Sequence, residues 1–281
     1  MCITRSRLLP TIAHISDLHL QSGNDARQAQ VEPILKKINE MKPDLVVISG
    51  DVTDDGWDSI DELKWVKYWI DVRIDAPQIV LPGNHDVGNF AGATKDAINE
   101  DRVKKWAETF DTSEVHEFDS WQLLGMNSMM IGMSDTNADD HLCEVYHWMR
   151  EAEYTGKWIA LFMHSPLFSK TIEEKNPAIN YWVGPKQWRE SFWHITNTHS
   201  QIKLIGSGHV HQTRLTEVDG VKIAWAPPAS GTWVHAPGLP NPPMPEKTGF
   251  FLHTLHDDGR VDSELIACAP MLKLYEHNPW P

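Results

Sequence analysis

Five short apolar segments of this chain each run directly into a block of aspartate, asparagine or histidine residues. The blocks are residues 14–19, 49–51, 82–86, 163–166 and 206–211. The apolar segments, such as Leu-Val-Val-Ile at residues 45–48, are typical of strands buried on both faces. In α/β sheets, ligand sites form at the carboxyl ends of the strands. We therefore expect the five blocks to meet at one edge of a sheet.

The blocks offer carboxylate, carboxamide and imidazole groups, which suit manganese, iron and zinc as ligands. Asp17 and His19 lie two positions apart in the sequence, as do His209 and His211. If strand geometry continued into the loops, each pair would project to one side. A carboxylate such as Asp51 can bridge two cations about 3.5–4 Å apart. The residue types therefore predict a site for two divalent metal ions.

Each block alone is a weak signal. An Asp-x-His segment is more often a surface pair than a metal site, and Gly-Asn-His-Asp at residues 83–86 looks like an ordinary turn. His164, which precedes Ser-Pro, is by itself more often a loop histidine with a structural hydrogen bond than a metal ligand. Five such blocks in order, each after an apolar strand, are hard to explain without a shared site.

Strands and helices are expected to alternate over the first three-quarters of the chain. The expected strands there are residues 11–16, 44–49, 78–81, 115–128 (a pair around Ser120), 158–163 and 201–207. The expected helices are residues 26–41, 57–72, 94–110, 139–154 and 185–198. Four more strands, residues 213–218, 221–226, 250–255 and 261–267, follow one another, with a hairpin turn at Asp219 and Gly220.

This order of elements favours an α/β fold with a mixed sheet, or two stacked sheets, covered by helices. We expect a single domain over residues 1–281, with a core at about residues 11–230. The strands and loop of residues 231–281 would complete the sandwich or form a cap or an interface. A homo-oligomer is left open, with the tryptophan-rich helix at residues 57–72 and the C-terminal segment as candidate interfaces.

Composition narrows the classes of partner and the location. The formal net charge is −14, from 25 basic and 39 acidic residues, which argues against stable binding to nucleic acid. The three cysteines, Cys2, Cys143 and Cys268, are widely spaced and fit reduced thiols in a cytoplasmic protein better than a disulfide framework. The sequence shows no secretion signal and no run of about 20 apolar residues, so we expect no transmembrane segment.

Taken together, the blocks resemble the calcineurin-like metallophosphoesterases. That family has Asp-x-His, Gly-Asp, Gly-Asn-His-Asp, a lone His and Gly-His-x-His in this order. The chain has all five, as Asp17-Leu18-His19, Gly50-Asp51, Gly83-Asn84-His85-Asp86, His164 and Gly208-His209-Val210-His211. The resemblance spans about residues 11–230. Length and block spacing are most similar to the class III cyclic nucleotide phosphodiesterases and the related glycerophosphodiesterases.

The resemblance implies a four-layer fold, in which two mixed β-sheets form a sandwich flanked by helices. It also implies a role for each block residue around two divalent or mixed-valence ions of manganese, iron or zinc. One ion would be held by Asp17, His19 and His211, the other by Asn84, His164 and His209, with Asp51 bridging the two. His85 and Asp86 would be catalytic: His85 would contact the phosphate and assist the leaving group, and Asp86 would orient His85. A structural role for Asp86 in the turn is an equal alternative.

The function implied is hydrolysis of a small phosphodiester by in-line attack of a metal-bridging hydroxide. A cyclic nucleotide, a glycerophosphodiester and a phospholipid headgroup are the candidate substrates. One alternative is a phosphomonoesterase of the same fold, for which protein phosphatase activity is disfavoured by the lack of an arginine beside the Asp51 and Asn84 blocks. The other is a non-catalytic interaction scaffold with a vestigial metal site. A nuclease is weakened by the negative charge. Residues 89–94, 168–182 and 230–245 are the candidate pocket walls, and 168–182 and 231–245 the candidate lids.

Overall fold

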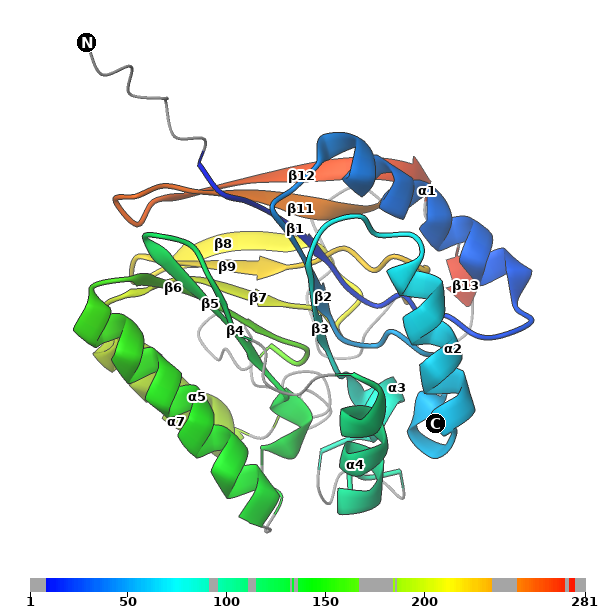
Figure 1. The fold of residues 1–281 in the computed structure, drawn as a ribbon, viewed down its shortest axis with the longest axis horizontal. Coiled ribbons are helices and arrows are strands. Elements are labelled where there is room, and N and C mark those ends of the chain that lie inside the picture. Colours follow the sequence, from blue (N-terminus) through cyan, green and yellow to red (C-terminus); the bar gives the residue numbers. More distant parts are fainter. Residues whose placement is uncertain are drawn as a thin grey trace.

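In the computed structural model of the protein, two β-sheets lie face to face and helices cover their outer sides (Figure 1). The structure describes residues 9–90, 96–110, 115–131, 133, 136–166, 184, 186–233, 247–270 and 273–275. One sheet has five strands in the order β12-β11-β1-β2-β3, and the other has six in the order β4-β5-β6-β7-β9-β8. The predicted fold class, two mixed sheets flanked by helices, is therefore confirmed.

The five-stranded sheet contains strands from both the N-terminal and the C-terminal part of the described chain. Its parallel strands are β1 (Thr11–Ile15), β2 (Leu45–Ser49) and β3 (Gln78–Leu81). Strand β11 (Lys247–Leu255) pairs antiparallel with both β1 and β12 (Val261–Pro270). The helices that pack their apolar residues against this sheet are α1 (Asp25–Met41), α2 (Ile60–Asp71) and α4 (Glu100–Thr109).

The six-stranded sheet comes from the middle of the chain. Its parallel strands are β5 (Trp121–Met126), β6 (Trp158–Met163), β7 (Ile202–Ser207) and β9 (Val221–Trp225). Its antiparallel edge strands are β4 (Val115–Glu117) and β8 (Arg214–Val218). Its outer face is covered by α5 (Thr136–Thr155) and α7 (Lys186–Thr198). The smaller elements are η1 (Gly56–Asp58), α3 (Asn84–Val87), η2 (Ser128–Met130) and a pair of short strands, β10 (Thr232–Trp233) and β13 (Lys273–Tyr275).

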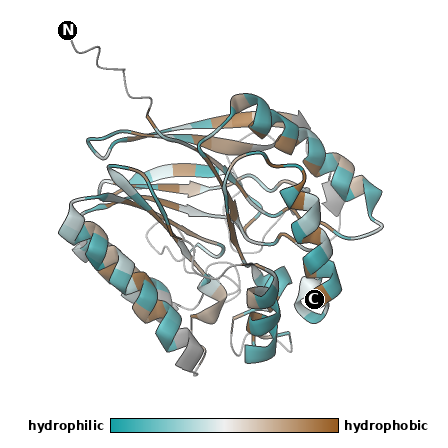
Figure 2. Cartoon of the chain, viewed as in Figure 1, coloured by the Kyte–Doolittle hydropathy of each residue, from teal (hydrophilic) through white to brown (hydrophobic). Residues whose placement is uncertain are grey.

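A continuous apolar core lies between the two sheets. Val47 and Leu81 of one sheet belong to the same buried cluster as Trp121, Phe162 and Leu204 of the other. Figure 2 shows brown, hydrophobic residues along the strands and a mixture of teal and brown on the helices. This distribution fits strands buried on both faces and helices with one face in solvent.

Two predicted helices begin later than expected, in both cases at a side chain that caps the helix. The helix predicted at residues 57–72 begins at Ile60, where the Ser59 hydroxyl accepts a hydrogen bond from the backbone N–H of Glu62. The helix predicted at residues 94–110 begins at Glu100, with Asn99 as its cap. Capping satisfies N–H groups that have no partner inside the helix, so these polar residues mark the start more reliably than apolar spacing does. Within the described residues, no helix combines the length and apolar character needed to span a membrane.

Candidate metal centre

The five blocks follow the carboxyl ends of β1, β2, β3, β6 and β7. Main-chain hydrogen bonds tie neighbouring loops together within each sheet: Asp17 N–H donates to the Gly50 carbonyl at 3.0 Å, and Gly208 N–H to the His164 carbonyl at 2.9 Å. Between the two sheets, His209 N–H donates to the Asp17 carboxylate at 3.1 Å. Gly83 permits a further close approach, that of the loop after β3 to the loop after β2, because a Cβ there would overlap the Asp51 carboxylate. The expected meeting of the blocks at one edge is therefore present.

Backbone conformation is unusual at this edge. Seven non-glycine residues of the described chain have positive φ, and five of these are predicted ligands: Asp17 (56°), His19 (44°), Asp51 (49°), His209 (67°) and His211 (52°). A left-handed residue costs roughly 1–2 kcal/mol, so the surrounding contacts must hold each one in place. Such conformations concentrate where side-chain direction matters more than local stability.

Strand geometry does not continue into the two i, i+2 pairs, so the condition under which each pair would project to one side is not met. Asp17 and His19 still reach the same cluster. Strands β1 and β7 end at Ile15 and Ser207, before the pairs begin. The left-handed turns instead send His209 and His211 into two different clusters. Side-chain direction in these loops comes from individual φ angles and not from the pleat of a strand.

The first cluster consists of Asp17, His19, Asp51 and His211. The Nε2 atom of His211 lies 3.2 Å from Asp17 Oδ1 and 3.1 Å from His19 Nε2. His19 Nε2 lies 3.6 Å from Asp51 Oδ2. The four side chains are buried, with exposed fractions between 0 and 7%.

The second cluster consists of Asp51, His164 and His209, with Asn84 beside it. The Nε2 atom of His164 lies 3.2 Å from both Asp51 Oδ2 and Asn84 Oδ1. The His209 ring centroid is 4.9 Å from that of His164. Asp51 belongs to both clusters, so all seven predicted ligand residues lie in two groups that share one carboxylate.

The arrangement of ring nitrogens fits bound cations. His211 Nδ1 donates to the Gly231 carbonyl at 3.0 Å, and His164 Nδ1 donates to the Ser49 carbonyl at 2.7 Å. In a neutral ring, Nε2 then carries a lone pair and no hydrogen. The Nε2 of His164 then faces two oxygens at 3.2 Å, an arrangement that requires either a second proton or a cation between the acceptors. The residues can therefore hold metal ions.

Electrostatics at the centre support this view. Burial alone would lower the pKa of His164, but the Asp51 carboxylate outweighs burial and raises it to about 9. Burial alone would raise the pKa of Asp51, but His164, His85 and His19 hold it well below its usual range. A buried carboxylate that attracts protons so strongly onto its neighbours also attracts cations, which compete with those protons.

His85 lies beside the first cluster. Its backbone N–H donates to Asp51 Oδ1 at 2.9 Å, and its Nδ1 donates to the Asp54 carbonyl at 2.5 Å. Its ring meets that of His19 edge to face, with centroids 4.7 Å apart. The Nε2 atom of His85 is therefore the ring nitrogen left for other partners.

The contacts of Asp86 differ from those expected for a residue that orients His85. One carboxylate oxygen accepts from the N–H groups of Val52 (3.1 Å) and Gly83 (2.8 Å), and the other accepts from the N–H (2.9 Å) and hydroxyl (2.7 Å) of Thr53. Asp86 thus fastens the loop after β3 to the loop after β2. The hydrogen bond that fixes the His85 tautomer comes from the main chain of Asp54, so the structure supports the turn role of Asp86.

Sequence reasoning missed Asp54 and Arg27. The Asp54 carboxylate lies 3.5 Å from His19 Nδ1 and forms an ion pair with the Arg27 guanidinium. Arg27 also donates to the His19 carbonyl at 2.9 Å. A carboxylate on the second nitrogen of a ligand histidine fixes its orientation and basicity. The available signal is a second aspartate three residues after Asp51.

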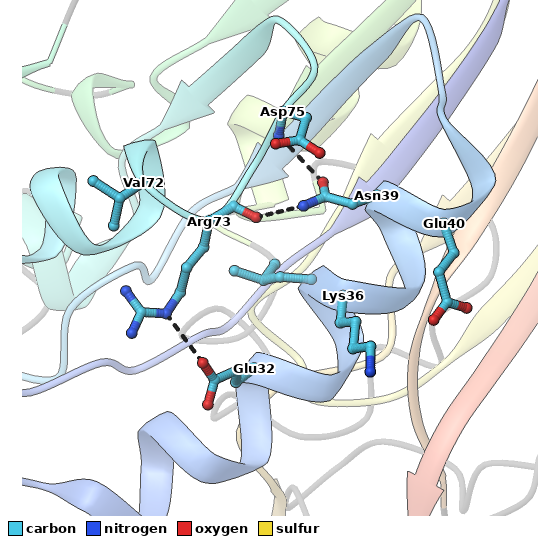
Figure 3. Close-up of a pocket in the computed structure, with 8 residues that line it drawn as sticks. Glu32, Lys36, Asn39, Glu40, Val72, Arg73 and Asp75 are labelled. Atoms are coloured by element: carbon cyan, nitrogen blue, oxygen red, sulfur yellow. Dashed lines mark hydrogen bonds and ion pairs between the residues drawn. The ribbon is translucent and has the colours of Figure 1, made fainter.

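A separate pocket lies between α1 and the end of α2 (Figure 3). Asn39 links the two elements there, because its side chain donates to the Arg73 carbonyl at 2.8 Å and accepts from the Asp75 N–H at 3.2 Å. Glu32 approaches Arg73 at 3.5 Å. The pocket contains none of the predicted ligands, and its polar groups serve to join the helices. The candidate lid at residues 168–182, and most of the candidate walls at 89–94 and 230–245, lie outside the described residues.

Comparison with known proteins agrees with this geometry. The sequence profile of the calcineurin-like phosphoesterase family matches residues 10–213. A probable glycerophosphodiester phosphodiesterase of Arcobacter nitrofigilis is 27% identical over 223 residues, 73% of this chain and 73% of that protein. A probable cyclic nucleotide phosphodiesterase of Synechococcus sp. is 24% identical over 240 residues, 82% of this chain and 84% of that protein.

Solved structures share the fold. The crystal structure of a dimetal phosphatase from Danio rerio has a TM-score of 0.62 at 12% identity, covering 95% of this chain and 98% of that one. A purple acid phosphatase from yellow lupin has a TM-score of 0.63 at 13% identity, covering 92% of this chain and 54% of that one. These similarities establish the architecture. Because the family profile covers well over half of the chain, the protein belongs to the calcineurin-like phosphoesterase family.

Proposed function

We propose that the protein is a two-metal phosphodiesterase acting on a small diester. The observation that carries this proposal is the pair of buried clusters that share Asp51, with His85 directly beside them. Two cations separated by one carboxylate suit displacement at phosphorus, since both the attacking and the leaving oxygen can be stabilised. The names of the related proteins, a glycerophosphodiester phosphodiesterase and a cyclic nucleotide phosphodiesterase, favour a diester.

We assign the ligands as the family resemblance implies. Asp17, His19 and His211 would hold one ion, Asn84, His164 and His209 the other, and Asp51 both. When bound, divalent or mixed-valence ions of manganese, iron or zinc would supply an activated water and offset charge on the phosphoryl oxygens. The residues of the chain would fix the positions of these ions. The Nδ1–carbonyl hydrogen bonds of His164 and His211 would keep Nε2 directed at them.

His85 would act on the leaving group. With Nδ1–H donated to the Asp54 carbonyl, Nε2 of the doubly protonated ring is the nitrogen that can donate a proton to the departing oxygen, which leaves His85 neutral. The Asp51 carboxylate, which accepts from the His85 backbone N–H, ties this residue to the cation site. General-acid assistance of this kind contributes about 10²–10⁴-fold to a rate.

A phosphomonoesterase of the same fold is the second candidate. A monoester dianion is usually held by an arginine clamp. Two arginines lie near the site, at the starts of α1 and α4, but Arg27 is paired with Asp54, and Arg102 donates to Asp58 at 3.1 Å and to the Ala97 carbonyl at 2.9 Å. These engagements favour the monoanionic diester. The complete ligand set argues against a non-catalytic scaffold.

The test compares bis(p-nitrophenyl) phosphate with p-nitrophenyl phosphate after loading with manganese, iron or zinc. The diester should be hydrolysed faster, and elemental analysis should find up to two metal ions per chain. Cyclic AMP, glycerophosphodiesters and intact phospholipid then identify the diester. Faster hydrolysis of the monoester would support the second candidate. Protein that binds no metal and has no metal-rescued activity would support the scaffold.

A further inference from the structure

A single loop between β2 and α2 contacts His85 in three different ways. Asp51 accepts a hydrogen bond from its backbone N–H, and the Asp54 carbonyl accepts one from Nδ1. The third contact comes from Trp57, whose ring stacks on the imidazole. We propose that Trp57 is a positioning residue that fixes the plane of the His85 ring for proton donation to the leaving group. This inference rests on the proposed function.

The stack is close to parallel. The ring centroids of Trp57 and His85 lie 6.1 Å apart, and the planes differ by 5°. The His19 ring meets the same imidazole at 80°, with centroids 4.7 Å apart. The imidazole therefore has one aromatic ring parallel to it and another nearly perpendicular to it. Offset stacked and edge-to-face pairs are the favourable geometries for aromatic rings.

The stacking adds a restraint that the hydrogen bonds cannot supply. The bond from Nδ1 to the Asp54 carbonyl fixes one atom of the ring but permits rotation about the line of that bond. The parallel indole of Trp57 restricts the plane of the His85 ring. Because Nδ1 and the ring plane are then both fixed, Nε2 can point in only one direction. An error of about 1 Å in such a group can cost about a hundredfold in rate.

Trp57 is itself held in place from outside the site. It lies in the short turn η1, and the Arg102 guanidinium lies over its ring at 5.1 Å from the centroid. Arg102 is only 9% exposed, and its hydrogen bonds to Asp58 and to the Ala97 carbonyl keep it in position. A cation over an indole face is attracted by the ring quadrupole. The tryptophan is therefore part of a supported stack and not a loosely attached surface residue.

The transfer of a proton from His85 to the leaving oxygen determines which substrates depend on the Trp57–His85 stack. The bond from phosphorus to the leaving oxygen breaks with its electron pair on that oxygen, which takes the proton from His85 Nε2. Water supplies the oxygen of the new bond to phosphorus, and its released proton passes to solvent, from which His85 is reprotonated. A basic alkoxide needs the donated proton far more than an acidic phenol does. Loss of the stack should therefore matter most for poor leaving groups.

The experiment uses metal-loaded wild type, Trp57→Ala and Trp57→Phe with a series of aryl methyl phosphate diesters. The leaving phenols range from p-nitrophenol to unsubstituted phenol, and an alkyl diester ends the series. For Trp57→Ala, the loss in kcat should grow along the series, from a few-fold to about a hundredfold, with a smaller change in KM. Trp57→Phe retains a flat ring and should recover most of the rate. Tyr154→Ala, at an aromatic that is 93% exposed on α5, is the control and should match wild type.

Two further measurements separate the outcomes. Metal content and thermal unfolding of each variant show whether the centre and the fold are intact. A loss that is equal for all leaving groups, or that resides in KM, would overturn the positioning role, because it would indicate packing or substrate contact. The same conclusion would follow if Trp57→Phe were as slow as Trp57→Ala. If the metal-loaded wild type hydrolysed no diester, the proposed function would fail first and the inference with it.

Discussion

His164 at the candidate metal centre and His14 between the two sheets are both completely buried, yet their partners differ in chemistry. His164 faces the Asp51 carboxylate at 3.2 Å. His14 instead meets the Ser49 hydroxyl at 2.9 Å and His253 Nε2 at 3.5 Å, and His253 continues to the Ser263 hydroxyl at 2.7 Å. One histidine has a full negative charge beside it, and the other has only neutral groups.

The two surroundings shift the pKa in opposite directions. Burial lowers the pKa of His14 to about 3, because the distant charge of Asp17 offsets only part of it. Burial and the neighbouring His14 hold the pKa of His253 well below its usual range. At His164 the same burial is outweighed by Asp51, and the pKa rises to about 9. Burial thus makes these histidines sensitive to their partners, and the partner decides the sign.

Ser49 joins the two environments. Its hydroxyl contacts His14, and its carbonyl accepts from His164 Nδ1 at 2.7 Å. The neutral network in the core therefore ends at the residue whose carbonyl bonds to the predicted ligand His164. Function at the centre and stability between the sheets should respond to different substitutions.

The largest expected effect comes from removing the charge of the Asp51 carboxylate, which distinguishes the surroundings of His164 from those of His14. Asp51→Asn should lower diester hydrolysis by more than the ten- to hundredfold that is typical for losing a residue that only supports a metal ligand. The reason is that both clusters lose their shared carboxylate. Hydrolysis of bis(p-nitrophenyl) phosphate and elemental analysis of metal content measure the effect. Asp61→Asn, on the exposed side of α2, is the control, and wild-type rate and metal content in Asp51→Asn would refute the shared-ligand assignment.

The next effect concerns a residue that acts through a ligand. Asp54→Asn weakens the partner of His19 Nδ1 and leaves Arg27 without its ion pair, so activity should fall by about ten- to hundredfold. The adjacent Asp55 is exposed, which makes Asp55→Asn a matched control with the same chemical change. Equal rates for the two variants would show that the Asp54 carboxylate does not support the centre.

The sequence alone predicted the features of the fold that depend on local sequence pattern. Strands 78–81 and 158–163 match β3 and β6 at both ends, because continuous apolar runs bounded by polar turns are strong signals. The Asp219–Gly220 hairpin is also present: both residues have positive φ, and Val218 pairs with Val221. Within each sheet the block residues converge because their strands are parallel neighbours, β1-β2-β3 in one sheet and β6-β7 in the other.

The features that the sequence did not predict depend on contacts between residues far apart in the chain. His14 was included in a block, but its partner His253 lies 239 positions later and on a strand that inserts beside β1. The pairing of β11 with β1, and not with the strands that precede it in the sequence, has no local signal. The left-handed φ angles of Asp17 and His211 are likewise not set by the local sequence, since only a few per cent of non-glycine residues adopt positive φ, even though aspartate and histidine do so more often than most.

The core histidines should make the stability of the protein depend on pH. His14 has a folded pKa of about 3, below the 6.5 of an unperturbed histidine, so the unfolded chain binds more protons between these values. Stability is complete above about pH 6.5 and falls as the pH drops toward 3, by up to about 1.4 kcal/mol per pH unit for this residue. His253 adds to the loss, because its pKa is shifted in the same direction.

Urea unfolding of wild type and His14→Asn at pH 7.5, 6.0 and 5.0 measures this contribution. The variant should be less stable at pH 7.5 but lose less stability on acidification, since it lacks the group that must be charged. Effects of pH on the metal centre are common to both proteins and cancel in the difference. His194→Asn, at an exposed histidine of α7, should follow wild type. Parallel pH profiles for wild type and His14→Asn would contradict the assignment.

The smallest expected effect lies at the far end of the neutral network. Ser263→Ala removes the hydroxyl that meets His253 Nδ1 at 2.7 Å, and should cost about 0.5–1.5 kcal/mol in the free energy of unfolding. Diester hydrolysis should stay close to wild type, because two histidines and Ser49 separate this hydroxyl from the ligand His164. Ser191→Ala, at an exposed serine of α7, controls for the loss of a hydroxyl. A loss of activity in Ser263→Ala comparable with that of Asp54→Asn would mean that the core network and the metal centre act as one unit, and the division between the two sets of histidines would then be wrong.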